Sequence, residues 1–213
     1  AIVDSQFTDL LPAYIQACTG FDALCQATES YWSVGASEQS RKYAERAIEL
    51  LVEYLSTAVT KGDLRAKENV MYAANLAGKA INISKTTAPH ALSYTITSLF
   101  GLPHGHAVAL VLGEFFQLHD HAINAQTDKT NDLVKLNGYM QRLYELMGVK
   151  NAMEANVKWK ETMKLCGLES DFNAIGINTD GDISNIVAGV NIERLSNHPI
   201  ELTTDMMKGI FRA

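Results

Sequence analysis

Four polar residues have the types and the spacing of ligands for a metal ion. Asp22 and Gln26 are four positions apart, so on a helix their side chains project from one face, one turn apart. His90 precedes His104 by fourteen residues, and Pro103 places His104 at an expected helix start, where the helix dipole favours a neutral imidazole. A carboxylate and two imidazoles suit a divalent first-row metal ion, with Gln26 as a weaker fourth ligand.

Spacing alone leaves an ordinary structural interpretation open for each of these residues. A single histidine on an apolar helix is more often a hydrogen-bonded core or surface residue than a ligand. Asp22 could equally be an acid in the first turn of its helix. A metal site requires that Asp22, His90 and His104 converge on one point from three helices, and the sequence holds no comparable cluster of ligands elsewhere.

Helical periodicity dominates the chain, and only four prolines interrupt its 213 residues. From Ser37 to Lys61 apolar residues recur at steps of three and four, with Ser37 as the N-cap and Gly62 as the stop. Asp63 is expected to cap a second helix that runs to about Ile81. Further helices are predicted at 19–32, 87–99, 103–121, 128–146, 150–165, 182–195 and 204–212, and residues 167–181 are the most loop-like. The predicted fold is an all-α domain of roughly eight or nine helices.

Net charge, cysteine count and the absence of targeting segments limit which partners and which cell compartment the chain is expected to have. The net charge is −6 with no basic block, which disfavours nucleic acid and anionic membranes as partners but admits a small anionic substrate in a basic pocket. Cys18, Cys25 and Cys166 are too few and too scattered for a disulfide framework or a thiolate zinc site, which favours reduced thiols. No signal peptide, membrane span or glycine-rich phosphate loop is evident, so a cytoplasmic protein without a nucleotide cradle is expected.

Three segments resemble the iron-containing (group III) alcohol dehydrogenase family. Residues 19–31, TGFDALCQATESY, resemble the family's T-G-x-D-A-L-x-H-A-x-E-x-Y segment. Residues 89–109 resemble its paired-histidine segment in both the fourteen-residue spacing and the Pro-His-Gly context. Residues 190–199, VNIERLSNHP, resemble its C-terminus, so the resemblance extends over essentially the whole chain.

The resemblance implies a domain organisation and a ligand set. In the family an N-terminal α/β domain binds NAD(P) and a C-terminal all-α domain holds the metal, so residues 1–213 are expected to be that second domain alone, inactive without the first. The ligands carried over are Asp22, Gln26, His90 and His104. Gln26 departs from the family's histidine, so weaker binding of Fe²⁺ is expected. Zn²⁺, or a site of three ligands in which Gln26 hydrogen-bonds a metal-bound water, is the alternative.

The same resemblance implies a reaction and a substrate. The metal would polarise an aldehyde carbonyl, and a nicotinamide held by the missing domain would supply the hydride. Residues 26–33 and 84–94 resemble one branch in particular, the phosphonoacetaldehyde reductases, which form 2-hydroxyethylphosphonate. A primary-alcohol or polyol dehydrogenase domain is an alternative, and so is a non-catalytic helical interaction domain, for which Gln26 is the best support. The expected partners are a small aldehyde or alcohol, the missing domain and a second copy in a homodimer.

Three further residues are candidates for roles around the metal. Tyr94 lies one turn beyond His90, where many relatives carry another histidine, and it could assist proton transfer or simply be a packed aromatic. Lys85 lies in a polar run before His90 and could bind a phosphonate or be an exposed loop lysine. His106 is a weaker candidate for a proton relay.

Overall fold

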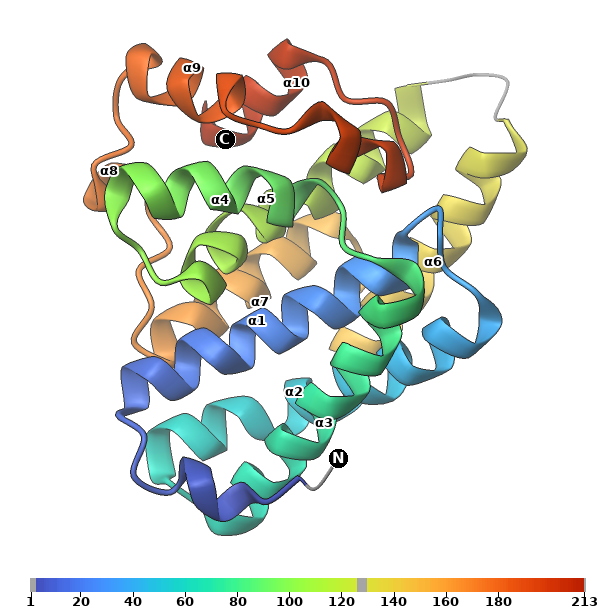
Figure 1. The fold of residues 1–213 in the computed structure, drawn as a ribbon. Helices are drawn as coiled ribbons and strands as arrows, with labels where there is room; N and C mark the ends of the chain where they lie inside the picture. Colours follow the sequence, from blue (N-terminus) through green and yellow to red (C-terminus); the bar gives the residue numbers. More distant parts are fainter. Residues whose placement is uncertain (1–2, 126–129, 213) are drawn as a thin grey trace.

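The computed structural model describes residues 3–125 and 130–212, which form an all-α fold without strands, as predicted (Figure 1). Helix α1 (Ala13–Trp32) runs through the middle of the molecule. It packs against α2 (Glu38–Lys61), α3 (Leu64–Ser84) and α5 (His104–Ala125). The other elements are η1 (Ser5–Thr8), α4 (Ala88–Phe100), α6 (Asn131–Met147), α7 (Ala152–Leu165), α8 (Phe172–Ile175), α9 (Asp180–Ala188), η2 (Ile192–Asn197), α10 (Thr204–Gly209) and η3 (Ile210–Arg212).

Local capping residues determine where the long helices begin and end. Ser37 forms a capping box with Ser40 at the start of α2, and Gly62 ends that helix with φ 63°, a left-handed conformation that glycine adopts without strain. The Asp63 carboxylate then accepts the Ala66 N–H at 2.7 Å and starts α3. These three predictions are confirmed.

Two boundaries differ most from the prediction. Helix α1 begins at Ala13 rather than residue 19, because Pro12, with φ −55°, precedes its first turn. The predicted helix 182–195 is wrong at its end: α9 stops at Ala188, and the Asn191 side chain accepts the Glu193 N–H to start η2 instead. A Cβ at Gly189 would lie 2.6 Å from Thr95 Oγ1, so glycine lets the end of α9 pack directly on α4.

The loop-like stretch 167–181 contains the short helix α8, and α9 begins within it at Asp180. The predicted start of a helix at Asp128 lies outside the described residues, and α6 is described from Asn131. Along the described parts of the chain, no helix is both long and apolar enough to cross a lipid bilayer.

The C-terminal elements cover α4 on the side away from α1, at the top of the view in Figure 1. Helix α9 and η2 pack on α4, and α10 packs on α9. Beneath them, α1 is buried along most of its length, with Phe21 and Trp32 at 0% and 1% exposure. The helix that carries Asp22 is therefore held on several sides, while the start of α4 is held by segments distant in the sequence.

Candidate metal centre

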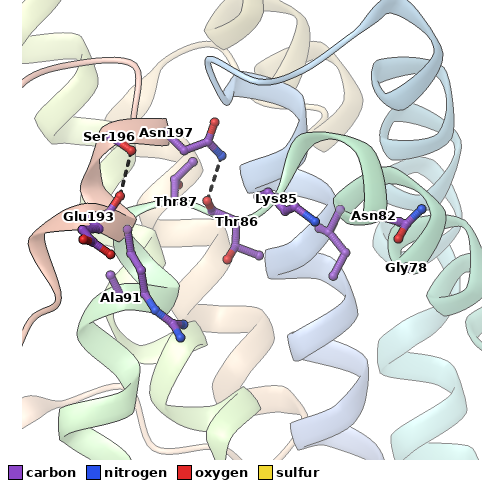
Figure 2. Close-up of a pocket in the computed structure, with 11 residues that line it drawn as sticks. Gly78, Asn82, Lys85, Thr86, Thr87, Ala91, Glu193, Ser196 and Asn197 are labelled. Atoms are coloured by element: carbon purple, nitrogen blue, oxygen red, sulfur yellow. Dashed lines mark hydrogen bonds between the residues drawn. The ribbon is translucent and has the colours of Figure 1, made fainter.

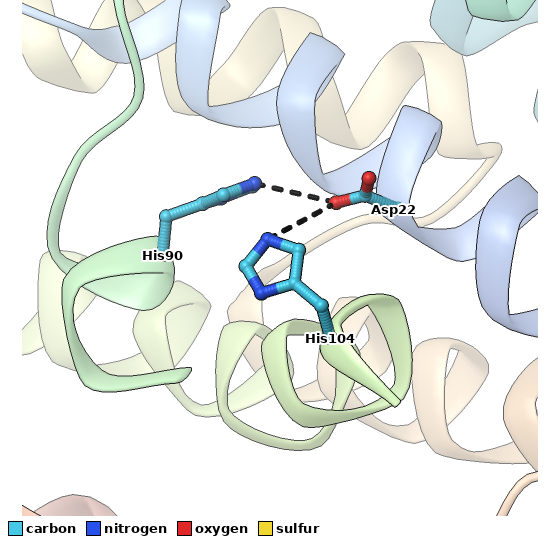
Figure 3. A group of neighbouring side chains, drawn as sticks. All are labelled: Asp22, His90 and His104. Carbon is cyan, nitrogen blue, oxygen red and sulfur yellow. Dashed lines mark ion pairs between the residues drawn. The ribbon is translucent and has the colours of Figure 1, made fainter. Parts of the chain in front are cut away.

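Three helices bring one carboxylate and two imidazoles together, as expected from the resemblance to the family's metal-binding segments (Figure 3). Asp22 projects from α1, His90 from the first turn of α4, and His104 from the first residue of α5. Asp22 Oδ1 lies 3.3 Å from His90 Nε2 and 3.8 Å from His104 Nε2. The candidate ligand atoms all lie within 4.8 Å of one another.

The donor set fits a divalent transition-metal ion. Ligand bonds of about 2.1 Å at tetrahedral angles separate two donor atoms by roughly 3.4 Å, close to the separations found here. Asp22 Oδ1 and His90 Nε2 are both buried, and they face each other as an ion pair at 3.3 Å, longer than the roughly 2.8 Å of a good charged hydrogen bond. A divalent ion held among the three side chains would replace these long contacts with short ligand bonds.

A glycine allows α5 to approach α1 closely enough to form the site. A Cβ at Gly105 would overlap the Cys18 carbonyl oxygen and would lie 2.8 Å from the Cβ of Asp22. The residue that follows His104 must therefore lack a side chain. Without this contact between the two helices, His104 would lie farther from Asp22.

The two imidazoles have different electrostatic surroundings. Burial alone would lower the pKa of His90, but the Glu29 and Asp22 carboxylates outweigh it and raise the pKa to about 10. Burial lowers the pKa of His104, and the nearby Asp22 carboxylate only partly offsets it. His104 is therefore a neutral ligand at pH 7, whereas a metal ion at His90 must displace a proton.

Gln26 contacts Asp22 on the face of α1 that carries the site. Its Nε2 donates to Asp22 Oδ2 at 3.0 Å, which leaves Oδ1 free to face the two histidines. The hydrogen bond orients the carboxylate. A role for Gln26 as a fourth ligand stays a prediction.

Tyr94 lies against the candidate metal centre, whereas both ring nitrogens of His106 are already hydrogen-bonded. The Tyr94 ring stacks on His104 with centroids 5.3 Å apart, and the side chain is 46% exposed, so it is not packed in the core. His106 Nε2 donates to the Glu169 carbonyl at 2.7 Å, while its Nδ1 accepts from the Tyr14 hydroxyl at 3.1 Å. Both ring nitrogens are occupied, which favours a structural role for His106 over a proton relay.

A cavity of about 590 Å³ lies between α3, the start of α4 and η2 (Figure 2). Lys85 and Arg194 line it, together with Thr86 and Asn197. The Arg194 guanidinium lies 4.5 Å from the centre of the Tyr94 ring, whose other neighbour is His104. Ala91, the residue after His90, lines the cavity, whereas Asp22, His90 and His104 are not among its lining residues.

The structure adds three residues that sequence reasoning missed: Glu29, Arg194 and Asn197. Glu29 had a usable signal, because 22, 26 and 29 form one stripe on a helix. Arg194 and Asn197 had none, since their partners lie about a hundred residues away in the sequence.

Comparisons with known proteins support the resemblance to the iron-containing alcohol dehydrogenases. Residues 16–213 match the family described as Fe-containing alcohol dehydrogenase family, C-terminal. The chain is 31% identical to aldehyde-alcohol dehydrogenase 2 of Entamoeba histolytica over 177 residues, which are 83% of this chain and 18% of that protein. It is 35% identical to the phosphonoacetaldehyde reductase of Streptomyces viridochromogenes over 105 residues, 49% of this chain and 26% of that protein.

Among solved structures, the fold is similar to sulfoacetaldehyde reductase from Bifidobacterium kashiwanohense in complex with NAD⁺. The TM-score is 0.84 and the identity 28%, with 98% of this chain and 52% of that chain covered. The chain thus spans about half the length of that structure, and a smaller share of the two relatives named above. It belongs to the Fe-containing alcohol dehydrogenase family and corresponds to the family's C-terminal, all-α domain.

Proposed function

We propose that this chain is the metal-binding half of an NAD(P)-dependent alcohol dehydrogenase or aldehyde reductase. The convergence of Asp22, His90 and His104, whose ligand atoms all lie within 4.8 Å of one another, supports this most directly. A non-catalytic interaction domain would have no use for a carboxylate and two imidazoles brought together from three helices. The NAD(P) is bound by a domain outside this chain, as in the family resemblance, and residues 1–213 form one domain.

Each group has a separate task in this proposal. A divalent iron or zinc ion would supply Lewis acidity toward the carbonyl oxygen of the substrate. Asp22 and the two histidines hold the ion, while Gln26 keeps the carboxylate oriented. Tyr94 stacks on His104 at the exposed side of the site, where its hydroxyl can pass a proton to or from the alcohol oxygen.

We further propose that the substrate is phosphonoacetaldehyde, with Lys85 binding its anionic group. Lys85 has φ 63° and ψ 177°, a region that is strained for any residue with a side chain. The Asn197 amide donates to the carbonyls on either side of it, Ser84 O at 2.8 Å and Thr86 O at 2.9 Å. This strain is maintained by a dedicated contact, which is typical of functional positions.

The cavity beside Lys85 has the chemistry of an oxyanion site. Lys85 and Arg194 supply two cations against one acid, Glu193, and the Thr86 side chain points into the cavity (Figure 2). Ammonium, guanidinium and hydroxyl groups are the donors that phosphonates and sulfonates require. Two relatives named above, the phosphonoacetaldehyde and sulfoacetaldehyde reductases, are named for two-carbon aldehydes that carry such a group.

A second candidate is a primary-alcohol dehydrogenase, favoured by the similarity to the Entamoeba aldehyde-alcohol dehydrogenase over most of this chain. Kinetics on the protein joined to its NAD(P)-binding domain separate the two. We expect Lys85→Met to raise the KM for phosphonoacetaldehyde at least about tenfold, with little change for propanal. Equal effects on both aldehydes, or none on either, would reject the phosphonate assignment. Loss of all reduction after removal of the divalent ion tests the broader proposal.

A further inference from the structure

Glu29 is a fully buried carboxylate whose two oxygens are both engaged. It lies on α1, on the same face as Asp22, and its exposed fraction is 0%. One oxygen, Oε1, bonds to Nδ1 of His90. The other, Oε2, accepts the Thr87 N–H at 2.6 Å and the Thr87 hydroxyl at 2.9 Å. A buried carboxylate with this many partners has a defined orientation.

The same carboxylate determines where α4 begins. Thr87 precedes the first residue of α4, and its side chain does not cap its own helix. Its hydroxyl accepts from Trp32 Nε1 at 3.0 Å and donates to Glu29. A chain of hydrogen bonds therefore runs from Trp32 through Thr87 and Glu29 to His90. The same carboxylate thus holds both the first turn of α4 and the imidazole ring in position.

The electrostatics explain why a charged residue is found there. Within the described residues, Glu29 makes no ion pair with a lysine or an arginine, and His90 is its only ionisable partner. A buried carboxylate of this kind requires a positive partner. An imidazole that binds a metal ion through its other nitrogen, with its proton retained on the nitrogen facing the carboxylate, meets that requirement.

We propose that Glu29 is a positioning residue, which keeps the His90 proton on Nδ1 and directs the Nε2 lone pair toward Asp22 and His104. The inference rests on the proposed metal site but concerns a residue that binds neither metal nor substrate. A purely structural Glu29 would affect the stability of α4 alone. A positioning Glu29 affects how tightly the three ligands hold an ion.

The test is Glu29→Gln, with Zn²⁺ alone as the probe. Because both Thr87 groups donate, the amide oxygen of the glutamine must face Thr87 and its NH₂ must face His90. Nδ1 then has to accept, which moves the ring proton to Nε2, the nitrogen that faces Asp22. We expect calorimetry to show Zn²⁺ binding weakened by about tenfold to a hundredfold.

The matched control is Glu114→Gln, because Glu114 is also a buried carboxylate on a helix. It accepts from Asn156 at 3.0 Å and pairs with Lys160, and neither of these partners belongs to the metal centre. We expect this variant to bind Zn²⁺ as the unmodified chain does. A Glu29→Gln chain that is folded by circular dichroism and binds Zn²⁺ within about threefold of the unmodified chain overturns the inference.

Nitrogen NMR of the His90 ring shows which nitrogen carries the proton and which binds the metal, and this experiment uses the unmodified chain. With Zn²⁺ bound, we expect Nδ1 to carry a hydrogen-bonded proton and Nε2 to carry the metal. Metal on Nδ1, or an Nδ1 proton without a hydrogen bond, contradicts the role of Glu29 even if the metal site is real. If the unmodified chain binds no Zn²⁺, Fe²⁺ or other divalent ion, the proposed function fails instead.

Discussion

At the scale of single residues, the site combines donors that could be recognised in the sequence with supports that could not. Asp22, His90 and His104 were predicted because their types and spacing suit a metal ion and their segments resemble those of a known family, and they converge as expected. Lys85 was predicted from a polar run, but its strained backbone has no local signal, since it depends on Asn197 far along the chain. Donor types can thus be read locally, whereas the contacts that orient them are tertiary.

Gln26→His should tighten Fe²⁺ binding. Gln26 lies one turn from Asp22 and already contacts its carboxylate at 3.0 Å, so an imidazole there reaches the same ion without a change of backbone. Imidazole is the better ligand for Fe²⁺, and we expect the Kd to fall at least about tenfold by calorimetry. Gln26→Leu is the control and should weaken binding modestly, because Asp22 loses its orienting donor. An unchanged Kd in the histidine variant would show that position 26 does not reach the ion.

Lys85→Gly should stabilise the protein while it removes a cation from the cavity. Glycine adopts φ 63° and ψ 177° freely, which relieves about 1–3 kcal/mol of strain and costs about 0.5–1 kcal/mol of chain entropy. Urea unfolding should therefore show a gain of about 1 kcal/mol. Lys79→Gly, inside α3, is the control and should lose about 1 kcal/mol. A destabilised Lys85→Gly chain would mean that the backbone at this position is not strained.

At the scale of elements, helix ends were predictable wherever their signals are local. Ser37, Gly62 and Asp63 determine the ends of α2 and α3 through their own side chains or backbone, and each was identified. The end of α9 at Ala188 was not: its C-cap is Gly189, whose close approach to Thr95 of α4 is a tertiary contact that periodicity does not encode. The segment η2, which carries Arg194 and Asn197, exists because α9 stops early.

The contact between α1 and α5 should be intolerant of a single methyl group. In Gly105→Ala the new Cβ overlaps the Cys18 carbonyl, so α5 must shift away from α1. We expect a loss of about 1–3 kcal/mol in urea unfolding, together with weaker Zn²⁺ binding because His104 moves with its helix. The control is Gly138→Ala on α6, where a Cβ meets nothing within 4 Å and should stabilise by about 0.5–1 kcal/mol. Similar stabilities for the two variants would refute the close approach.

At the scale of the whole molecule, two buried histidines join the C-terminal cover to the helices beneath it. His198, directly after η2, and His119 of α5 lie with their Nε2 atoms 3.2 Å apart. Burial lowers the pKa of His119 to about 3, and burial together with His119 lowers the pKa of His198. Both rings are neutral in the folded protein, so one nitrogen donates and the other accepts. Charging either ring would break this contact.

The stability of the protein should therefore fall in mild acid. The folded pKa values of both histidines lie below the unfolded value of about 6.5, so the stabilisation is complete above that pH and is lost as the pH falls below it. Between about pH 6 and pH 5, these two residues should lower the free energy of unfolding by up to about 1.4 kcal/mol each per pH unit. The slope of the free energy of unfolding against pH can be measured by urea unfolding at each pH. His198→Gln should reduce this slope by the contribution of one histidine, while His121→Gln, on the exposed side of α5, should leave it unchanged. Equal slopes for His198→Gln and the unmodified chain would show that His198 is not held neutral in the folded protein.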